Sequence, residues 1–205
     1  MSPTATRSQV KRHPERAAYD TEAVHAVLDA APMGHLGFVV DGQPFVIPML
    51  YGRIDDAVYL HGSVASRVMR TMAGGIEVCL TVTIVDGLVL ARSAFHHSMN
   101  YRSAVVFGRA VPVEGDEKVA GLKAISDQLR PGRWDEVREP TDRELRQTSV
   151  LRLDVAEASA KARSGGPIDE PEDLDLPVWA GVIPCELSWG TPVPDEATPE
   201  EAVPA

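Results

Sequence analysis

The segment HGSVASRVMR, residues 61–70, is the first place in the chain where residue types and spacing suggest chemistry. A strand is predicted to end here and a helix to cover Val64–Ala73. A helix start offers free N–H groups, and neighbouring hydroxyl and guanidinium groups add donors that suit a phosphate. A serine cap with surface arginines gives the same pattern, so both interpretations stay open. The candidate phosphate ligands are Ser63, Ser66 and Arg67.

A second polar segment, FHHSMNYR at residues 95–102, directly precedes a predicted strand. Its polar groups could form one wall of a cofactor site, or simply the exposed start of a strand. Neighbouring histidines on an extended chain point to opposite sides, so His96 and His97 are not expected to share a metal. The spacings HxH and HExxH are absent, and no metal site is predicted.

Three residues near the C-terminus could also meet a ligand. Lys161 and Arg163 are two apart, so on a strand they share a face and could hold an anion, although a solvated sheet edge explains them equally well. Trp179 could line a flat ligand, and core packing is its ordinary role. The chain has no GxSxG, GxGxxG or GxxxxGK[ST] motif, and no catalytic side chain is predicted.

The composition is that of an acidic globular protein. The 205 residues carry a net charge of −10, with 44% hydrophobic and 24% charged residues, which argues against nucleic acid as a partner. The chain has two cysteines, no secretory signal, and no stretch near the roughly 20 apolar residues that span a bilayer. These features indicate a reducing compartment. We therefore expect a cytoplasmic protein that does not bind a membrane.

The hydrophobic pattern predicts mainly short strands joined by turns. Strands over residues 34–40 and 43–51 flank Asp41-Gly42, a strong hairpin signal, and Pro48 marks an edge, a bulge or a ligand-facing position. Further strands are expected at 57–61, 76–85, 101–110, 111–114 and 149–160, and helices at 20–31, 64–73, 116–130 and 141–147. Strands in quick succession, without crossover helices between the first three, predict a small antiparallel β-barrel with peripheral helices.

The expected domain organisation has three parts. Residues 1–18 are predicted to be a flexible arm, 19–187 the barrel domain, and 188–205 a disordered tail that is acidic and rich in proline.

Three segments in order resemble the pyridoxamine 5'-phosphate oxidase-like superfamily, and within it the branch of flavin-nucleotide-binding and nitroimidazole-resistance proteins. They read DGQPFVIPMLYGRIDDAVYLHGSVASRVMR, VCLTVTIVDGLVLARSAFHHSMNYRSAVVFGRA and ASAKARSGGPIDEPEDLDLPVWAGVIP. The resemblance covers residues 19–184. It implies a mainly β, split-barrel fold that forms a homodimer, with FMN at the interface and touched by both chains.

The resemblance also implies roles for individual residues. The backbone of Ile47, Pro48, Met49 and Leu50 would run along the flavin ring, with Thr83 near its pyrimidine edge. Phosphate binding would fall to Ser63, Ser66 and Arg67, in agreement with the helix-start pattern. The remaining implied contacts are His61 beside the cofactor and substrate, Ser98, Asn100 and Arg102 along the wall, and Lys161 and Trp179 closing the pocket.

One departure bears on the reaction. The phosphate motif R-x-x-x-L-K of the pyridoxamine phosphate oxidases is absent, since residues 67–71 read RVMRT. Oxidation of pyridoxamine phosphate is therefore not expected. The leading hypothesis is an FMN-dependent oxidoreductase that acts by hydride transfer on an unidentified small molecule.

Two alternatives remain. The first is a non-catalytic binding protein for a flavin (FMN or FAD), a deazaflavin of the F420 type or haem, with His61, His96 or His97 as the axial ligand of haem iron. The second is a nitroreductase-like detoxifying protein.

Overall fold

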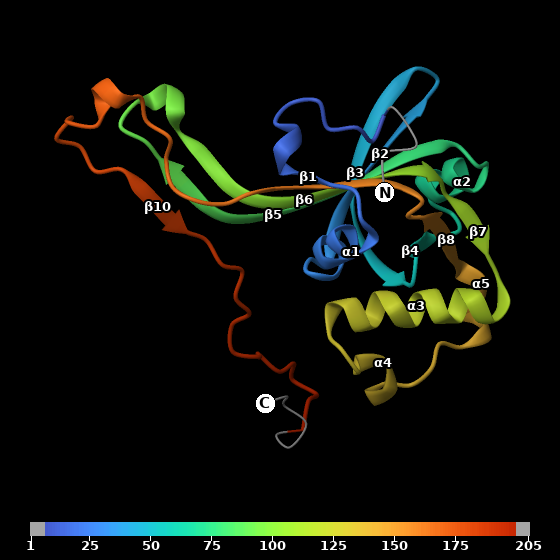
Figure 1. Cartoon of the computed structure of the whole chain (residues 1–205). Coiled ribbons are helices and arrows are strands. Elements are labelled where there is room, and N and C mark those ends of the chain that lie inside the picture. Colours follow the sequence, from blue (N-terminus) through green and yellow to red (C-terminus); the bar gives the residue numbers. More distant parts are fainter. Residues whose placement is uncertain (1–6, 200–205) are drawn as a thin grey trace.

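The computed structural model describes residues 7–199, which form a mainly antiparallel β structure with a few helices. Figure 1 shows a barrel from which a long arm projects, with α3 and α4 beside the barrel. The strands are β1 Ala17–Ala18, β2 Met33–Val40, β3 Gln43–Ile54, β4 Ala57–Ser63, β5 Glu77–Leu90, β6 Ser98–Arg109, β7 Val111–Val113, β8 Thr148–Asp154, β9 Glu157–Arg163 and β10 Gly181–Pro184. The helices are α1 Thr21–Asp29, α2 Arg67–Ala73, α3 Gly115–Leu129, α4 Arg133–Glu136 and α5 Asp142–Gln147, with short 3-10 turns at Pro14–Arg16, Ala94–His96 and Pro171–Asp173.

The predicted hairpin between β2 and β3 is confirmed. Asp41 and Gly42 have positive φ values of 50° and 77°. A two-residue hairpin turn requires this conformation at both positions to match the right-handed twist of the flanking strands. Helix α1 also begins as predicted, because the Asp20 carboxylate accepts a hydrogen bond from the Ala23 N–H at 2.9 Å.

The barrel is split along β3. Residues Gln43–Leu50 of this strand pair with β2, whereas only Tyr51–Ile54 pair with β4. Within the described residues, the first half of β3 therefore has no strand on its second edge. Helix α2 contacts β4 and lies opposite this open edge, so the two enclose a groove. The split barrel is thus a consequence of one long strand changing partners halfway.

A second opening lies along β5. This strand pairs with β2 over Val78–Thr81 and with β10 over Gly87–Leu90, and among the described residues no strand pairs with residues 82–86 on that edge. β10 comes so close at Gly87 that an added Cβ would lie 2.8 Å from the Ile183 carbonyl oxygen. Glycine is therefore needed there for β10 to dock.

The core fills the barrel and continues under α3. The largest fully buried side chains include Tyr51, Leu36, Leu60 and Leu151. α3 packs directly on β3, and a Cβ at Gly52 would lie 2.3 Å from the carbonyl carbon of Ala124. This close approach explains why a glycine interrupts an otherwise bulky strand.

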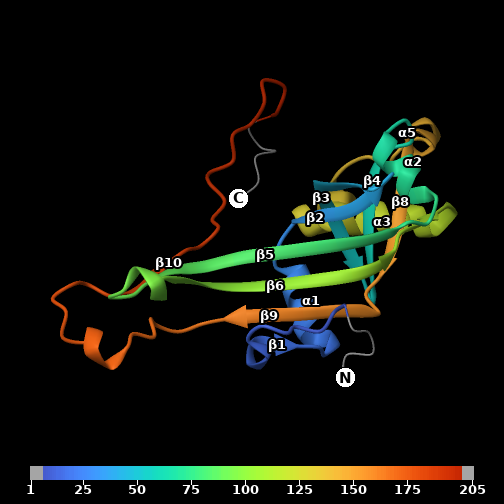
Figure 2. The ribbon, with the colours of Figure 1, turned by 90° about the horizontal axis from the view of Figure 1, so that it is seen from above.

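The arm consists of the far ends of β5 and β6. Residues that follow β9 run out to its tip, and the chain then returns through β10 (Figure 2). Two clamps hold the outgoing segment. Arg163 is buried, and its guanidinium donates to the Asn100 side chain and to the carbonyls of Gly165 and Gly166. At the tip, Arg92 forms an ion pair with Asp169 at 2.8 Å.

Three predicted elements need correction. The helix expected at Val64 begins at Arg67, because the Val64 N–H bonds to the Gln147 carbonyl and keeps the preceding residues extended. The strand predicted over 149–160 is two strands, β8 and β9, separated by a turn at residues 155–156. β5 runs five residues past its predicted end at Val85, because β6 and β10 extend it into the arm.

The two ends of the chain differ. Residues 7–18 of the predicted arm include β1, which pairs with β9, and Arg7 forms ion pairs with Glu77 and Glu157. Residues 188–199 have no regular structure, and the rest of the predicted tail, 200–205, lies outside the described residues, as do residues 1–6. None of the described helices has the length and apolar character needed to cross a membrane.

Candidate functional site

The open edge of β3 and the facing helix α2 enclose two adjoining cavities, which we call together the split groove. The two cavities share Ile47 and Val68 in their walls. The His61 cavity has a volume of about 300 Å³ and is lined by Ile47, Pro48, Met49, Leu50, His61, Gly62, Ser66, Val68 and Met69. The Phe45 cavity has a volume of about 290 Å³ and is lined by Phe38, Val40, Asp41, Gln43, Phe45, Ile47, Arg67, Val68 and Thr71.

His61 is the polar group at one end of the groove. It lies near the end of β4, and neither ring nitrogen has a hydrogen-bond partner among the described residues; Nδ1 is fully buried. Burial lowers the pKa of the His61 imidazole below its usual value. The ring is therefore neutral at pH 7, with a lone pair free for a metal or a ligand N–H and with one N–H to donate. A buried polar atom without a partner marks a place where a ligand is expected.

Arg67 lies at the other end of the groove, at the start of α2. Its guanidinium carbon is 5.5 Å from the centre of the Phe45 ring, and Phe45 in turn stacks on Phe38 with ring centres 5.5 Å apart. Within residues 7–199, no carboxylate pairs with Arg67, although acids outnumber bases in this chain by 30 to 20. The aromatic platform thus holds a cation that still has its donors free for an anion.

The two candidate serines are placed differently. Ser66 occupies the N-cap position of α2 without forming a side-chain cap, and it lines the His61 cavity. Ser63 is exposed, and its hydroxyl accepts a hydrogen bond from the Ala65 N–H at 3.2 Å. Ile47, Pro48, Met49, Leu50, His61 and Ser66 are therefore brought into one cavity, with Arg67 in the next.

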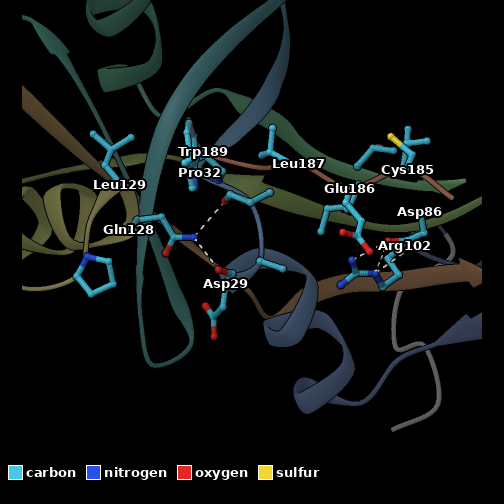
Figure 3. A pocket seen from close by; sticks show the side chains of 16 residues that line it. Asp29, Pro32, Asp86, Arg102, Gln128, Leu129, Cys185, Glu186, Leu187 and Trp189 are labelled. Carbon is cyan, nitrogen blue, oxygen red and sulfur yellow. Dashed lines mark hydrogen bonds and ion pairs between the residues drawn. The ribbon is translucent and has the colours of Figure 1, made fainter. Parts of the chain in front are cut away.

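A larger cavity, of about 750 Å³, lies at the open stretch of β5 beneath residues 185–189, which we call the C-terminal strap (Figure 3). It contains two further predicted site residues, Thr83 and Arg102. Arg102 holds Asp86 through both carboxylate oxygens, at 2.7 to 3.2 Å. The ion pair keeps the pKa of the Asp86 carboxyl below its usual value.

Two further groups of this strap cavity, the Gln128 amide and the Cys185 backbone, are also engaged. The Gln128 amide nitrogen donates to the carbonyls of Leu28, Asp29 and Ala31, and so caps the end of α1. The Cys185 N–H bonds to the Asp86 carbonyl at 3.1 Å, which fastens the strap to β5. Figure 3 shows Trp189 of the strap beside Pro32. The strap cavity is roomy, but its walls are held together by bonds already made.

Besides Ser63, four predicted site residues line neither a cavity of the groove nor the strap cavity. The Asn100 side chain is used by Arg163 and Gly165. Lys161 donates to the Arg12 carbonyl at 2.7 Å. Ser98 and Trp179 lie on the arm, both exposed, and the Trp179 ring packs over Gly181.

The outer face of the sheet carries an unusual pattern. Residues directly opposed across neighbouring strands share a face. Two rows across β3, β2, β5 and β6 read Pro48–His35–Thr81–Val105 and Val46–Gly37–Cys79–Phe107. Neither row has an acid, a lysine or an arginine, and Val46 is 67% exposed. A sheet face that remains in water normally carries polar side chains. This face lacks charged ones over two rows, so it is suited to being covered by another surface.

Sequence reasoning missed Phe45, Gln43 and Thr71, which line the Phe45 cavity. Phe45 alternates with Ile47 and Met49, so the period of β3 alone would have placed it on the same face. Thr71 carried no such signal, because its contact depends on how α2 packs. Among the described residues no cluster of histidine, cysteine or acidic side chains could hold a metal ion, and both cysteines are free thiols.

Comparisons with known proteins agree on one family. A model of the family described as pyridoxamine 5'-phosphate oxidase matches residues 20–162. The flavocytochrome Anf3 from Azotobacter vinelandii is 41% identical, with a TM-score of 0.89 over 98% of this chain and 94% of that chain. An FAD and heme binding protein from Mycobacterium smegmatis is 34% identical, with a TM-score of 0.87 over 91% of this chain and 92% of that chain.

A third structure shares the fold at lower identity. A protein from Bacteroides thetaiotaomicron, described as a candidate 5-nitroimidazole antibiotic resistance protein, is 22% identical, with a TM-score of 0.60 over 71% of this chain and 85% of that chain. None of the curated proteins compared with the chain matches it.

Proposed function

Because the chain belongs to the pyridoxamine 5'-phosphate oxidase family, we propose that it is a flavin-binding protein whose cofactor lies in the split groove. The observation that carries the proposal is the pairing of two unsatisfied groups in one groove. Within the described part of the chain, the neutral His61 at one end has no hydrogen-bond partner, and the Arg67 guanidinium at the other end has no ion-pair partner. A flavin nucleotide has a flat ring with polar edges and an anionic tail, which matches both ends.

The residues of the groove have separate roles in this proposal. Ile47, Met49 and Val68 provide apolar walls for the ring, and the open backbone edge of β3 offers hydrogen-bonding groups to its polar margin. Arg67 and Ser66 bind phosphate. His61 orients the ring or the substrate through a hydrogen bond.

The reaction class follows from the cofactor. A bound flavin supplies hydride or electron transfer, and the chain excludes water and positions a small-molecule substrate over the ring. We therefore propose a flavin-dependent oxidoreductase in which no side chain acts as acid or base. Reduction of nitro compounds is one reaction within this class, and turnover of a nitroimidazole with a reductant tests it.

The proposal includes a homodimer that buries the two uncharged rows of the outer face of the sheet. Thr83 and Lys161 lie in the next row of that face, opposed through Ser103. In the dimer, one chain supplies the groove, and the partner supplies contacts from this row and from the arm. Ser98 and Trp179 would reach the cofactor in this way, whereas Asn100 and Arg102 would act indirectly, by holding Arg163 and Asp86 in place.

A single charge tests the dimer. Val46→Asp places a carboxylate at the β3 end of the uncharged row Val46–Gly37–Cys79–Phe107, and it is expected to give a folded monomer by sedimentation velocity. Val193→Asp is the matched control, because Val193 is 91% exposed in the segment that follows the C-terminal strap. A Val46→Asp protein that sediments as a dimer would exclude this interface.

Haem is the second candidate ligand, and His61 favours it. A neutral imidazole that has no other partner is the usual axial ligand of haem iron, and Met49, Val68 and Met69 give the cavity an apolar lining. The other two candidate ligands of haem iron already have partners. The His97 Nδ1 accepts from the Ala91 N–H, and His96 pairs with Glu170. Relatives named for both a flavin and a haem support testing the two together.

The absorption spectrum of the purified protein tests both candidates. Flavin bands that persist through gel filtration, or saturable quenching of added FMN or FAD, are the expected result. A Soret band that is lost in His61→Ala would show that the protein also binds haem, with His61 as the axial ligand. A colourless protein that takes up neither flavin nor haem at micromolar concentration would refute the proposed function.

A further inference from the structure

Two prolines lie on the stretch of β3 whose open edge borders the split groove. Pro44 and Pro48 are opposed to Val39 and His35 of β2. Proline has no N–H to give to a strand ladder, so it is tolerated where its nitrogen points away from the neighbouring strand. Because the two prolines are four positions apart, both nitrogens belong to the same edge of β3, which is the open one.

The backbone carbonyls of β3 have the matching direction. An added Cβ at Gly37 of β2 would lie 3.9 Å from the Phe45 carbonyl oxygen, so this carbonyl points toward β2. In an antiparallel ladder, the backbone groups of successive residues alternate between the two edges of the strand. The carbonyls of Pro44, Val46 and Pro48 therefore point to the open edge. Of these three residues, only Val46 also has an N–H to offer there.

The two prolines differ in what surrounds them. Pro48 lines the His61 cavity, whereas Pro44 lines neither cavity of the groove, and its carbonyl accepts from the Gln43 side-chain amide at 3.3 Å. Within residues 7–199, no strand pairs with Pro48 on the open edge and no donor reaches its carbonyl. The His61 cavity thus contains a backbone acceptor that is free for the N–H or O–H of a ligand.

The margin of a flavin ring changes its hydrogen-bonding character on reduction. In the oxidised ring, N1, N5 and the two carbonyl oxygens accept hydrogen bonds, and N3–H is the donor. Uptake of two electrons and a proton at N5 converts that nitrogen into an N–H donor. A cavity edge that offers an acceptor and lacks a donor therefore suits the reduced ring, whereas a backbone N–H at the same place would suit the oxidised one.

We propose that Pro48 shifts the equilibrium of the bound flavin toward its reduced state, because it presents a carbonyl to the His61 cavity where other residues would also present an N–H. This inference rests on the proposed flavin function. It concerns the relative affinity for the two redox states, and the electrons themselves come from an external reductant. It also gives a role to the proline that the sequence pattern marked as a ligand-facing position.

The test compares the dissociation constants of oxidised FAD and of FAD reduced anaerobically with dithionite, on the full-length protein. Pro48→Ala restores a backbone N–H at the cavity edge. In this variant the ratio of the oxidised to the reduced dissociation constant is expected to fall about tenfold, which equals a decrease of about 30 mV in the reduction potential of the bound flavin. Titration against a reference dye measures that potential independently.

Two further variants isolate the restored N–H. Pro44→Ala makes the same chemical change on the same edge but outside both cavities, and it should leave the ratio unchanged within about twofold. Pro48→Val also restores the N–H, keeps an apolar side chain that favours a strand, and should reproduce Pro48→Ala. An unchanged ratio in both Pro48 variants, or an equal fall in Pro44→Ala, would overturn the inference. Failure of the unmodified protein to bind either redox state would instead refute the proposed function.

Discussion

The split groove and the strap cavity differ in which groups remain free. The strap cavity is the larger, at about 750 Å³, but Arg102, Asp86 and Gln128 are already bonded to one another or to backbone. Each cavity of the groove is less than half that size, yet within residues 7–199 neither His61 nor Arg67 has a polar partner. Burying the His61 Nδ1 without a partner is costly, so such a group persists where a ligand completes it, and the exposed Arg67 keeps its donors open to an anion. Satisfaction of polar groups is therefore a better guide to the site than volume.

The largest expected effect comes from exchanging the arginine in each region for methionine. Arg67→Met removes a free guanidinium and should weaken FAD by about 10- to 100-fold, the range of a charge-assisted hydrogen bond. Arg102→Met should change FAD affinity by less than about threefold, because its guanidinium is already held by Asp86. Fluorescence titration gives both values.

A third arginine serves as the control for this pair. Arg70 lies one turn from Arg67 on α2 and lines neither cavity, so Arg70→Met should bind FAD normally. The reverse order, with Arg102→Met the more damaging, would move the site to the strap cavity.

A substitution at Gly87 tests whether the second region has a structural role. In Gly87→Ala the new Cβ would meet the Ile183 carbonyl oxygen at 2.8 Å, so β10 must shift from β5. We expect a loss of about 1–3 kcal/mol in the free energy of unfolding, measured by urea denaturation, with FAD affinity unchanged. Gly166→Ala, where an added Cβ meets nothing within 4 Å, is the control. A loss of FAD affinity without loss of stability would contradict the structural role.

The smallest effect concerns pH. Burial lowers the pKa of His61 in the folded chain, so between the folded and unfolded values the unfolded state binds more protons. This contribution to stability is complete above the ordinary histidine pKa and is lost as pH falls through the lowered one. The melting temperature of the ligand-free protein should therefore decrease less between pH 7 and pH 5 in His61→Gln than in the unmodified protein. Parallel curves would show that His61 is not desolvated.

Much of the fold could be predicted from the sequence, because local signals agreed with the tertiary structure. The Asp41-Gly42 turn and the Thr141–Glu144 capping box each formed as their residue types require. The break between β8 and β9 could not be predicted, since residues 149–160 keep a strand-like composition across the turn. What divides them is a tertiary bond from the Val155 N–H to the Asp56 carbonyl.

The site was predicted only in part. Ile47–Leu50 and His61, which the family resemblance proposes as ligand contacts, share one cavity because one strand and the end of β4 position them. The division of the remaining residues between the groove, the strap cavity and the arm depends on where β3 and β5 change partners. That property belongs to the whole sheet, and no local pattern encodes it.

Hydrogen–deuterium exchange with and without FAD tests the central claim most directly, because it compares both regions in one experiment. The account predicts new protection at the amides of residues 43–50 in β3 and 67–73 in α2, which border the split groove. Protection confined to residues 82–86 and 185–189, with the groove amides unchanged, would place the cofactor under the C-terminal strap and contradict the account.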